Sequence, residues 1–147
     1  MLEEYFSNET LSAALKRVMI TSYDIQNREP LFFKSWKVKF RSVEMKFVAR
    51  ATSAAPTFFE PALVPVGGAM KALVDGGVFI NNPSVSAYAE AIKEFPGEEI
   101  KLVSLGTGEL VRPISYDEAK DWGKGGWMLP VLSCMFDGVS DAADYQR

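Results

Sequence analysis

The sequence contains no histidine. This absence excludes Ser-His-Asp and Cys-His catalysis, and every histidine-based metal site, from within the chain. A single cysteine, Cys134, likewise excludes an internal disulfide and any multi-cysteine metal site. Acid–base chemistry in these residues must therefore use carboxylates, lysine, tyrosine or that one thiol.

Long apolar runs and strong positive charge are also missing. No apolar run approaches the roughly 20 residues of a membrane-spanning helix. The first ten residues, MLEEYFSNET, are acidic and have no signal-peptide pattern. The formal net charge of −3 argues against a general nucleic-acid binder. We therefore expect a cytoplasmic or peripheral membrane protein that has no nucleic-acid partner.

The chain does have the content of a globular domain. Its 147 residues are 48% hydrophobic, which suffices for a real core. No internal repeat or low-complexity tract interrupts it. We expect one domain over residues 1–147, and the lack of a natural domain start and of a final helix cap indicates that this domain is incomplete.

Periodicity and turn residues predict alternating strands and helices. In the first half we expect a helix at 7–15, a strand at 17–25 and a partner strand that begins at Leu31. We then expect a strand in which Trp36, Val38 and Phe40 alternate with basic residues, followed by a helix that stops before Pro56. In the second half we expect a hairpin around Gly67-Gly68, with Pro65 in an edge strand or at a strand end. A helix capped by Asn82 and started by Pro83 should follow, then a strand at 100–105 and helical segments to the end. The strand–helix–strand order favours a parallel α/β unit.

The residues from Lys34 to Arg50 are strongly basic. Six basic residues and one acidic residue give this window a charge of +5, against −8 for the rest of the chain. A solvated strand face is the simpler interpretation. The alternative is a patch that meets anionic lipid head groups, because clustered Lys and Arg are attracted to such surfaces.

The segment VDGGVFINNP, from Val74 to Pro83, places Asp75 between an apolar run and two glycines. Because Gly76 and Gly77 have no Cβ, the carboxylate would be open to a substrate or to another loop. With no histidine available, such a carboxylate could take the proton from a serine nucleophile. Taken alone, however, the segment is more typical of a simple Asp-Gly turn.

Other candidate motifs favour structural roles. Gly106-Thr107-Gly108 lacks the third glycine of a dinucleotide fingerprint, because position 111 is Val111. In GVSDA, the serine elbow G-x-S-x-G is broken at Ala142, so Ser140 is interpreted as a helical surface serine. Cys134 lies in an apolar context and is expected to be a buried packing residue. The acidic residues near the C-terminus have no metal-binding spacing and are expected on solvated helix faces: Asp117, Glu118, Asp121, Asp137, Asp141 and Asp144.

Several segments, in this order, resemble the patatin-like phospholipase family. They are ITSYDIQNREPLFF, ARATSAAPTFFEP, LVDGGVFINNP, VSLGTGE and DGVSDAADYQ, and they span the chain from about Arg17 onward. The resemblance implies part of a three-layer α/β/α domain with a mainly parallel central sheet. It also implies a lipid acyl hydrolase with a Ser-Asp dyad, in which Asp75 is the general base and Gly76 and Gly77 complete its motif. No cofactor or metal is implied.

The family's nucleophile lies in G-x-S-x-G, downstream of a glycine-rich oxyanion loop, and neither motif occurs in this sequence. The chain therefore resembles the C-terminal half of a patatin domain. By itself we expect it to be inactive and to need a missing N-terminal half, or a partner chain, to supply the serine. Phe58, Phe59 and the basic window are candidate contacts for a lipid or acyl-ester substrate or a membrane surface. The alternative is a non-enzymatic truncated fragment, or a subunit that binds lipid or a partner.

Overall fold

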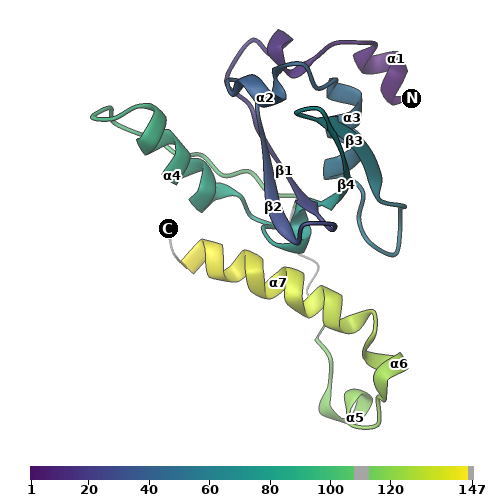
Figure 1. The fold of residues 1–147 in the computed structure, drawn as a ribbon. Coiled ribbons are helices and arrows are strands. Elements are labelled where there is room, and N and C mark those ends of the chain that lie inside the picture. Colours follow the sequence, from purple (N-terminus) through teal and green to yellow (C-terminus); the bar gives the residue numbers. More distant parts are fainter. Residues whose placement is uncertain (108–112, 146–147) are drawn as a thin grey trace. The chain divides into compact units, whose positions relative to one another are not determined.

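A computed structural model describes residues 1–107 and 113–145 of the chain. The chain divides into two compact units, Met1–Asn81 and Asn82–Arg147. The first unit holds a four-stranded sheet and the second is helical (Figure 1). The predicted α/β class is therefore confirmed. No helix among the described residues combines the length and the apolar character needed to cross a membrane.

The sheet of the first unit is built from two hairpins. Its strands are β1 (Met19–Asp24), β2 (Glu29–Lys34), β3 (Ala62–Val66) and β4 (Ala69–Asp75), in the spatial order β2-β1-β4-β3. All three strand pairs are antiparallel. The predicted strands near residues 17–25 and 31–33 are confirmed.

The β3–β4 hairpin follows from its turn residues. Gly67 and Gly68 have φ angles of 60° and 86°, which is the left-handed conformation that a tight two-residue hairpin turn requires. Pro65 lies exposed on β3, which is an edge strand among the described residues, as its missing N–H predicts. The predicted hairpin and its edge strand are therefore confirmed.

The core of this unit lies between the sheet and helix α3 (Met45–Thr52). Side chains from all four strands form one hydrophobic cluster with Val48 and Ala51 of α3. Phe33, Val48, Val64 and Leu73 are completely buried. Helix α3 ends at Thr52, before Pro56, as predicted.

Two predictions for the first unit are wrong. The expected helix at 7–15 is replaced by α1 (Leu2–Phe6) and a 3₁₀ turn, η1 (Leu11–Ala13). The backbone between them bonds instead to a distant segment: Leu11 N–H donates to the carbonyl of Val43, and Met45 N–H donates to that of Glu9. A tertiary pairing thus replaces the local helix.

The expected alternating strand at Trp36–Phe40 is instead a turn followed by helix α2 (Val38–Arg41). The ladder between β1 and β2 ends at the Met19–Lys34 pair, so a longer strand would find no partner in β1. Phe40 turns back onto Phe33, with ring centroids 5.5 Å apart, and is buried. Val38 is left 85% exposed.

The second unit consists of helices α4 (Ser84–Glu94), α5 (Tyr116–Ala119), α6 (Lys124–Trp127) and α7 (Pro130–Tyr145). Helix α4 begins at Ser84 with Pro83 as its N-cap residue, one residue later than predicted, and the Asn82 side chain accepts from Ser84 N–H at 3.1 Å. Its apolar side chains are only partly covered, because Tyr88 and Ile92 are 44% and 48% exposed.

Three further predictions for the second unit differ from the structure. Residues 100–105 form no strand, and Val103 and Leu105 are exposed, since the four described strands pair only with one another. The expected parallel strand–helix–strand unit is thus absent from the described residues, and a mainly parallel sheet is not seen there. Cys134 is exposed on α7, not buried. The side chains of Ser140 and Asp144, and Gly108, lie outside what the structure describes.

Candidate functional site

Asp75 is the last residue of β4, one of the two inner strands of the sheet. Its backbone pairs with Ser22 of β1. Its N–H donates to the carbonyl of buried Ala54, just beyond the end of α3, at 3.0 Å. Asp75 is thus fixed from a neighbouring strand and from the segment that follows α3.

The carboxylate of Asp75 is half-buried and is oriented by its own turn. Its Oδ1 accepts from Gly77 N–H at 2.8 Å, which caps the 3₁₀ turn η2 (Gly76–Val78). Within the described part of the chain Asp75 forms no ion pair. A carboxylate held in this way keeps oxygen lone pairs with which to accept a proton or a hydrogen bond.

The two glycines after Asp75 have different roles. A Cβ on Gly76 would lie 2.2 Å from Thr21 Oγ1 and 2.7 Å from the Thr21 backbone carbonyl carbon, so only glycine fits against β1. A Cβ on Gly77 would lie 3.3 Å from Asp75 Oδ1 and 3.4 Å from Asn81 Oδ1. Gly76 thus allows the close packing, and Gly77 keeps space beside the carboxylate.

The chain after the glycines is anchored by an aromatic ring. Phe79 lies against Tyr23 and Phe32, with ring centroids 6.0 Å and 5.6 Å away. Its N–H and that of Ile80 both donate to the Gly76 carbonyl. The turn that presents Asp75 is therefore fastened to β1 and β2.

The serine that pairs with Asp75 in the sheet lacks the features of an activated nucleophile. Ser22 lies across the ladder from Asp75, but its hydroxyl is completely buried and donates to the Val74 carbonyl at 2.7 Å. It holds the strand register and is closed to a substrate. No sequence pattern indicates this role for Ser22 or the contact between Thr21 and Gly76, since both depend on strand pairing.

Phe58 and Phe59 are the other predicted site residues, and they are 80% and 60% exposed. Their N–H groups donate to the carbonyl of Ala55 at 3.1 and 2.9 Å. Because the preceding carbonyl, that of Ala54, accepts from Asp75, one short segment positions both the two rings and the carboxylate. The Arg50 guanidinium lies 5.7 Å from the Phe59 ring centroid and donates to the Glu60 carbonyl.

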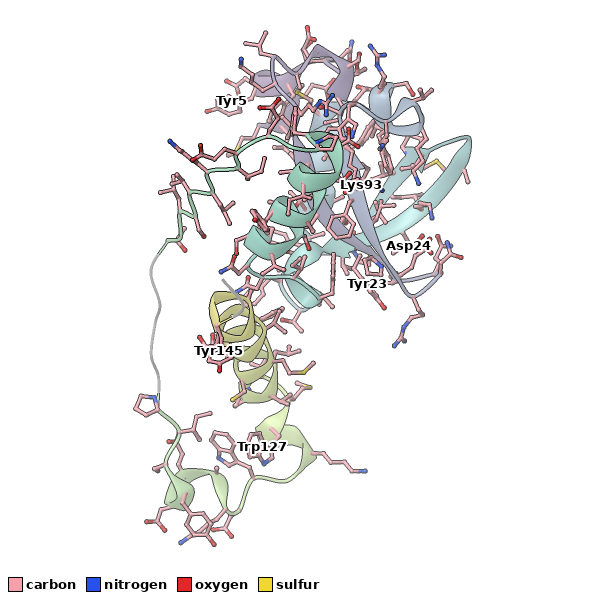
Figure 2. The ribbon with its side chains drawn as sticks, turned by 90° about the vertical axis from the view of Figure 1, so that its left-hand side faces the viewer. Tyr5, Tyr23, Asp24, Lys93, Trp127 and Tyr145 are labelled. Atoms are coloured by element: carbon pink, nitrogen blue, oxygen red, sulfur yellow. The ribbon has the colours of Figure 1, made fainter. Side chains whose placement is uncertain are left out.

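A second charged cluster lies where β1 enters its turn (Figure 2). Asp24 is completely buried and accepts from Lys71 Nζ at 2.5 Å, from Asn27 Nδ2, and from the N–H groups of Gln26 and Asn27. Burial raises the pKa of the Asp24 carboxyl, but these hydrogen bonds outweigh it and lower the pKa to about 2. The cluster connects both hairpins around a buried carboxylate, so its role is structural.

Comparisons with known proteins show what the chain as a whole resembles. No family model matches the sequence. The chain is 33% identical to patatin-like protein 6 of Arabidopsis thaliana over 157 aligned residues, with 97% of this chain and 31% of that protein covered. It is 31% identical to patatin-like protein 7 of the same plant, with coverage of 98% and 32%.

A third relative is the probable inactive patatin-3-Kuras 1 of Solanum tuberosum, which is 29% identical, with 99% of this chain and 45% of that protein covered. The chain thus spans less than half the length of each of these relatives. The matches are consistent with the C-terminal part of a patatin domain. Along nearly its whole length, the chain belongs to the patatin-like proteins.

Proposed function

We propose that this chain provides the general base, Asp75, of a patatin-like lipid acyl hydrolase. The observation that carries the proposal is the carboxylate itself: it is half-buried, oriented by Gly77 N–H, and forms no ion pair within the described chain. The absence of histidine from the sequence gives further support, since a Ser-Asp dyad needs none.

In the proposed reaction, Asp75 takes the proton from a serine hydroxyl as the serine oxygen attacks the carbonyl carbon of an ester. The tetrahedral intermediate expels the alcohol, which receives that proton, and leaves an acyl-enzyme. Water, deprotonated by Asp75, then attacks the acyl group, and the fatty acid is released as the serine oxygen regains its proton from Asp75. No metal or cofactor enters this scheme.

The serine in this proposal comes from outside the chain. Ser22 is excluded by burial, and the sequence contains no G-x-S-x-G. The relatives are more than twice as long, which supports a missing N-terminal half, or a partner chain, as the source of the elbow serine and the oxyanion donors. The chain alone is then inactive, because each lost element removes several kcal/mol of transition-state stabilisation, roughly 3 to 4 for one oxyanion donor.

The same missing segment would complete the fold. We infer a three-layer α/β/α domain whose mainly parallel strands come largely from outside this chain. The exposure of Val103 and Leu105, which are 78% and 91% accessible in an apolar run, supports a missing neighbour at that place.

The substrate we propose is an acyl ester in a lipid, with Phe58 and Phe59 in contact with its apolar chains. Two exposed aromatic rings held on the segment that also fixes Asp75 suit such a contact. Aromatic rings bring large apolar area at small cost in conformational entropy.

The direct test is Asp75→Asn in the complete protein, assayed on an acyl ester. Asn keeps an oxygen that can accept from Gly77 N–H, so the turn should persist while the base is lost. We expect activity to fall by a factor of 10² or more, the typical contribution of a general base. The matched control, Asp121→Asn on an exposed site, should keep full activity. Retained activity in Asp75→Asn would contradict the proposal.

The second candidate is a non-enzymatic subunit or fragment that binds lipid or a partner chain. One relative is named as a probable inactive patatin, and this name supports considering a non-enzymatic role. A fluorophosphonate probe reacts with an activated serine and separates the two: we expect labelling of the complete protein and none of this chain alone. An unlabelled complete protein supports the second candidate.

A further inference from the structure

The turn after β2 exposes several cations around one apolar side chain. We call Lys37–Arg41, which comprises the residue before α2 and α2 itself, the basic turn. Lys37, Lys39 and Arg41 are exposed, and Val38 between them is 85% exposed. The five residues contain no acidic side chain. The surface therefore combines three positive charges with an apolar apex.

The basic turn is held in place by the core below it. Phe40 is only 3% exposed and packs on Phe33 of β2. The N–H of Lys37 donates to the Lys34 carbonyl, and that of Phe40 to the Lys37 carbonyl, each at 3.0 Å. A surface fixed in this way loses little conformational entropy when it docks.

Two acidic groups of the first unit pair with a lysine outside the basic turn. Glu44 is the one acidic residue in the window from Lys34 to Arg50, and its carboxylate lies 2.9 Å from Lys46 Nζ. Glu3 of α1 also contacts Lys46, at 3.2 Å. The positive charge of the basic turn is therefore not cancelled by these carboxylates.

We propose that the basic turn docks the protein on an anionic lipid bilayer. Three cations are attracted to the negative surface of such a bilayer, and the exposed valine at their centre can enter its apolar boundary. Nucleic-acid phosphates, by contrast, would not contact that valine favourably. The inference deepens the proposed function, because it names the surface that brings a lipid hydrolase to its substrate. Its test measures binding without turnover, so the two can fail separately.

The test uses the full chain and vesicles of phosphatidylcholine with or without phosphatidylserine. A basic residue near an anionic surface contributes about a fivefold factor in binding. The triple variant Lys37→Ala, Lys39→Ala, Arg41→Ala should therefore lower the partition coefficient on the order of a hundredfold. Added salt should weaken binding of the parent chain in the same direction.

The matched control removes three exposed lysines of the second unit, as Lys93→Ala, Lys101→Ala, Lys124→Ala, and changes the net charge equally. It should bind as the parent does. Equal losses in both triple variants, or parent binding that does not depend on phosphatidylserine, would overturn the proposal. Tighter binding to a single-stranded RNA than to the vesicles would overturn it in favour of nucleic acid. Circular dichroism checks that each variant folds like the parent.

Direct contact is tested at the apex. Val38→Cys in a Cys134→Ser background carries one thiol, which accepts a polarity-sensitive fluorophore. Its emission should shift to the blue on vesicles with phosphatidylserine. The same dye at Leu102→Cys, an exposed position in the second unit, should not shift. Equal shifts at both positions, or none at Val38→Cys, would contradict docking through the basic turn.

Discussion

Asp75 N–H donates to the carbonyl of Ala54 at 3.0 Å, and this bond joins the end of β4 to the segment after α3. The carbonyl of Ala55, one residue later, holds Phe58 and Phe59. The proposed base and the proposed lipid contact thus have one backbone support. Substitutions that change only the side chains, and leave this backbone support intact, should therefore separate the contribution of the base from that of the lipid contact.

Gly76 should tolerate no side chain. In Gly76→Ala the new Cβ would meet the side chain and the backbone of Thr21 at less than 3 Å, so β1 or η2 must move. We expect a loss of about 3 kcal/mol in the free energy of unfolding, at the upper end of overpacking costs. Urea denaturation of the full chain measures it.

Gly77→Ala is the matched control, because its Cβ would approach only to 3.3 Å and should cost less than about 1 kcal/mol. Thr21→Ala combined with Gly76→Ala should recover only part of the loss, since the backbone carbonyl carbon of Thr21 stays 2.7 Å from the new Cβ. Equal stability of the two alanine variants would show that the close packing of Gly76 is absent.

Acid should destabilise the first unit through Asp24. The pKa of this carboxyl is about 2 in the folded chain, below its ordinary value of 3.8. A depressed folded-state pKa means that the carboxylate's contribution is complete above about pH 4 and is lost as the pH falls toward 2. From that difference we expect a loss of about 2 kcal/mol, measured as the free energy of unfolding against pH.

Asp24→Asn removes the titrating group, so the variant should lack this acid-dependent component. At neutral pH it should be less stable by about 3 kcal/mol, the usual cost of leaving one member of a buried ion pair alone. The double variant Asp24→Asn, Lys71→Met should lose less free energy of unfolding than the two single variants lose in sum, because both single changes break the same ion pair. Strict additivity would contradict the assigned pairing.

Phe58→Ala with Phe59→Ala should impair lipid substrates selectively. Both rings are exposed, so the free energy of unfolding should change by less than about 1 kcal/mol. In the complete protein we expect a raised KM for esters in vesicles and little change for a short soluble ester. The control is Tyr116→Ala, an equally exposed ring in the second unit. An equal effect on both kinds of ester would argue against a lipid-contact role.

What the sequence by itself determined is what depends on local chemistry. Two glycines set the β3–β4 turn, α3 ends before Pro56, the Asn82 side chain accepts from the first N–H of α4, and the segment around Asp75 carries the family resemblance. Each depends on neighbouring residues alone, through backbone dihedral angles or missing N–H groups. Composition alone, which needs no structure, established that no histidine in these residues takes part in catalysis.

What only the tertiary structure decided depends on partners far apart in the chain. Alternation at 36–40 predicted a strand, but Phe40 gains more by packing on Phe33, and the basic side chains then surround an exposed Val38. Similarly, the need for glycine at position 76 comes from Thr21, and the depressed pKa of Asp24 depends on Lys71. Periodicity describes one segment, whereas burial and pairing are properties of two segments in contact, and that is why the sequence alone could not give them.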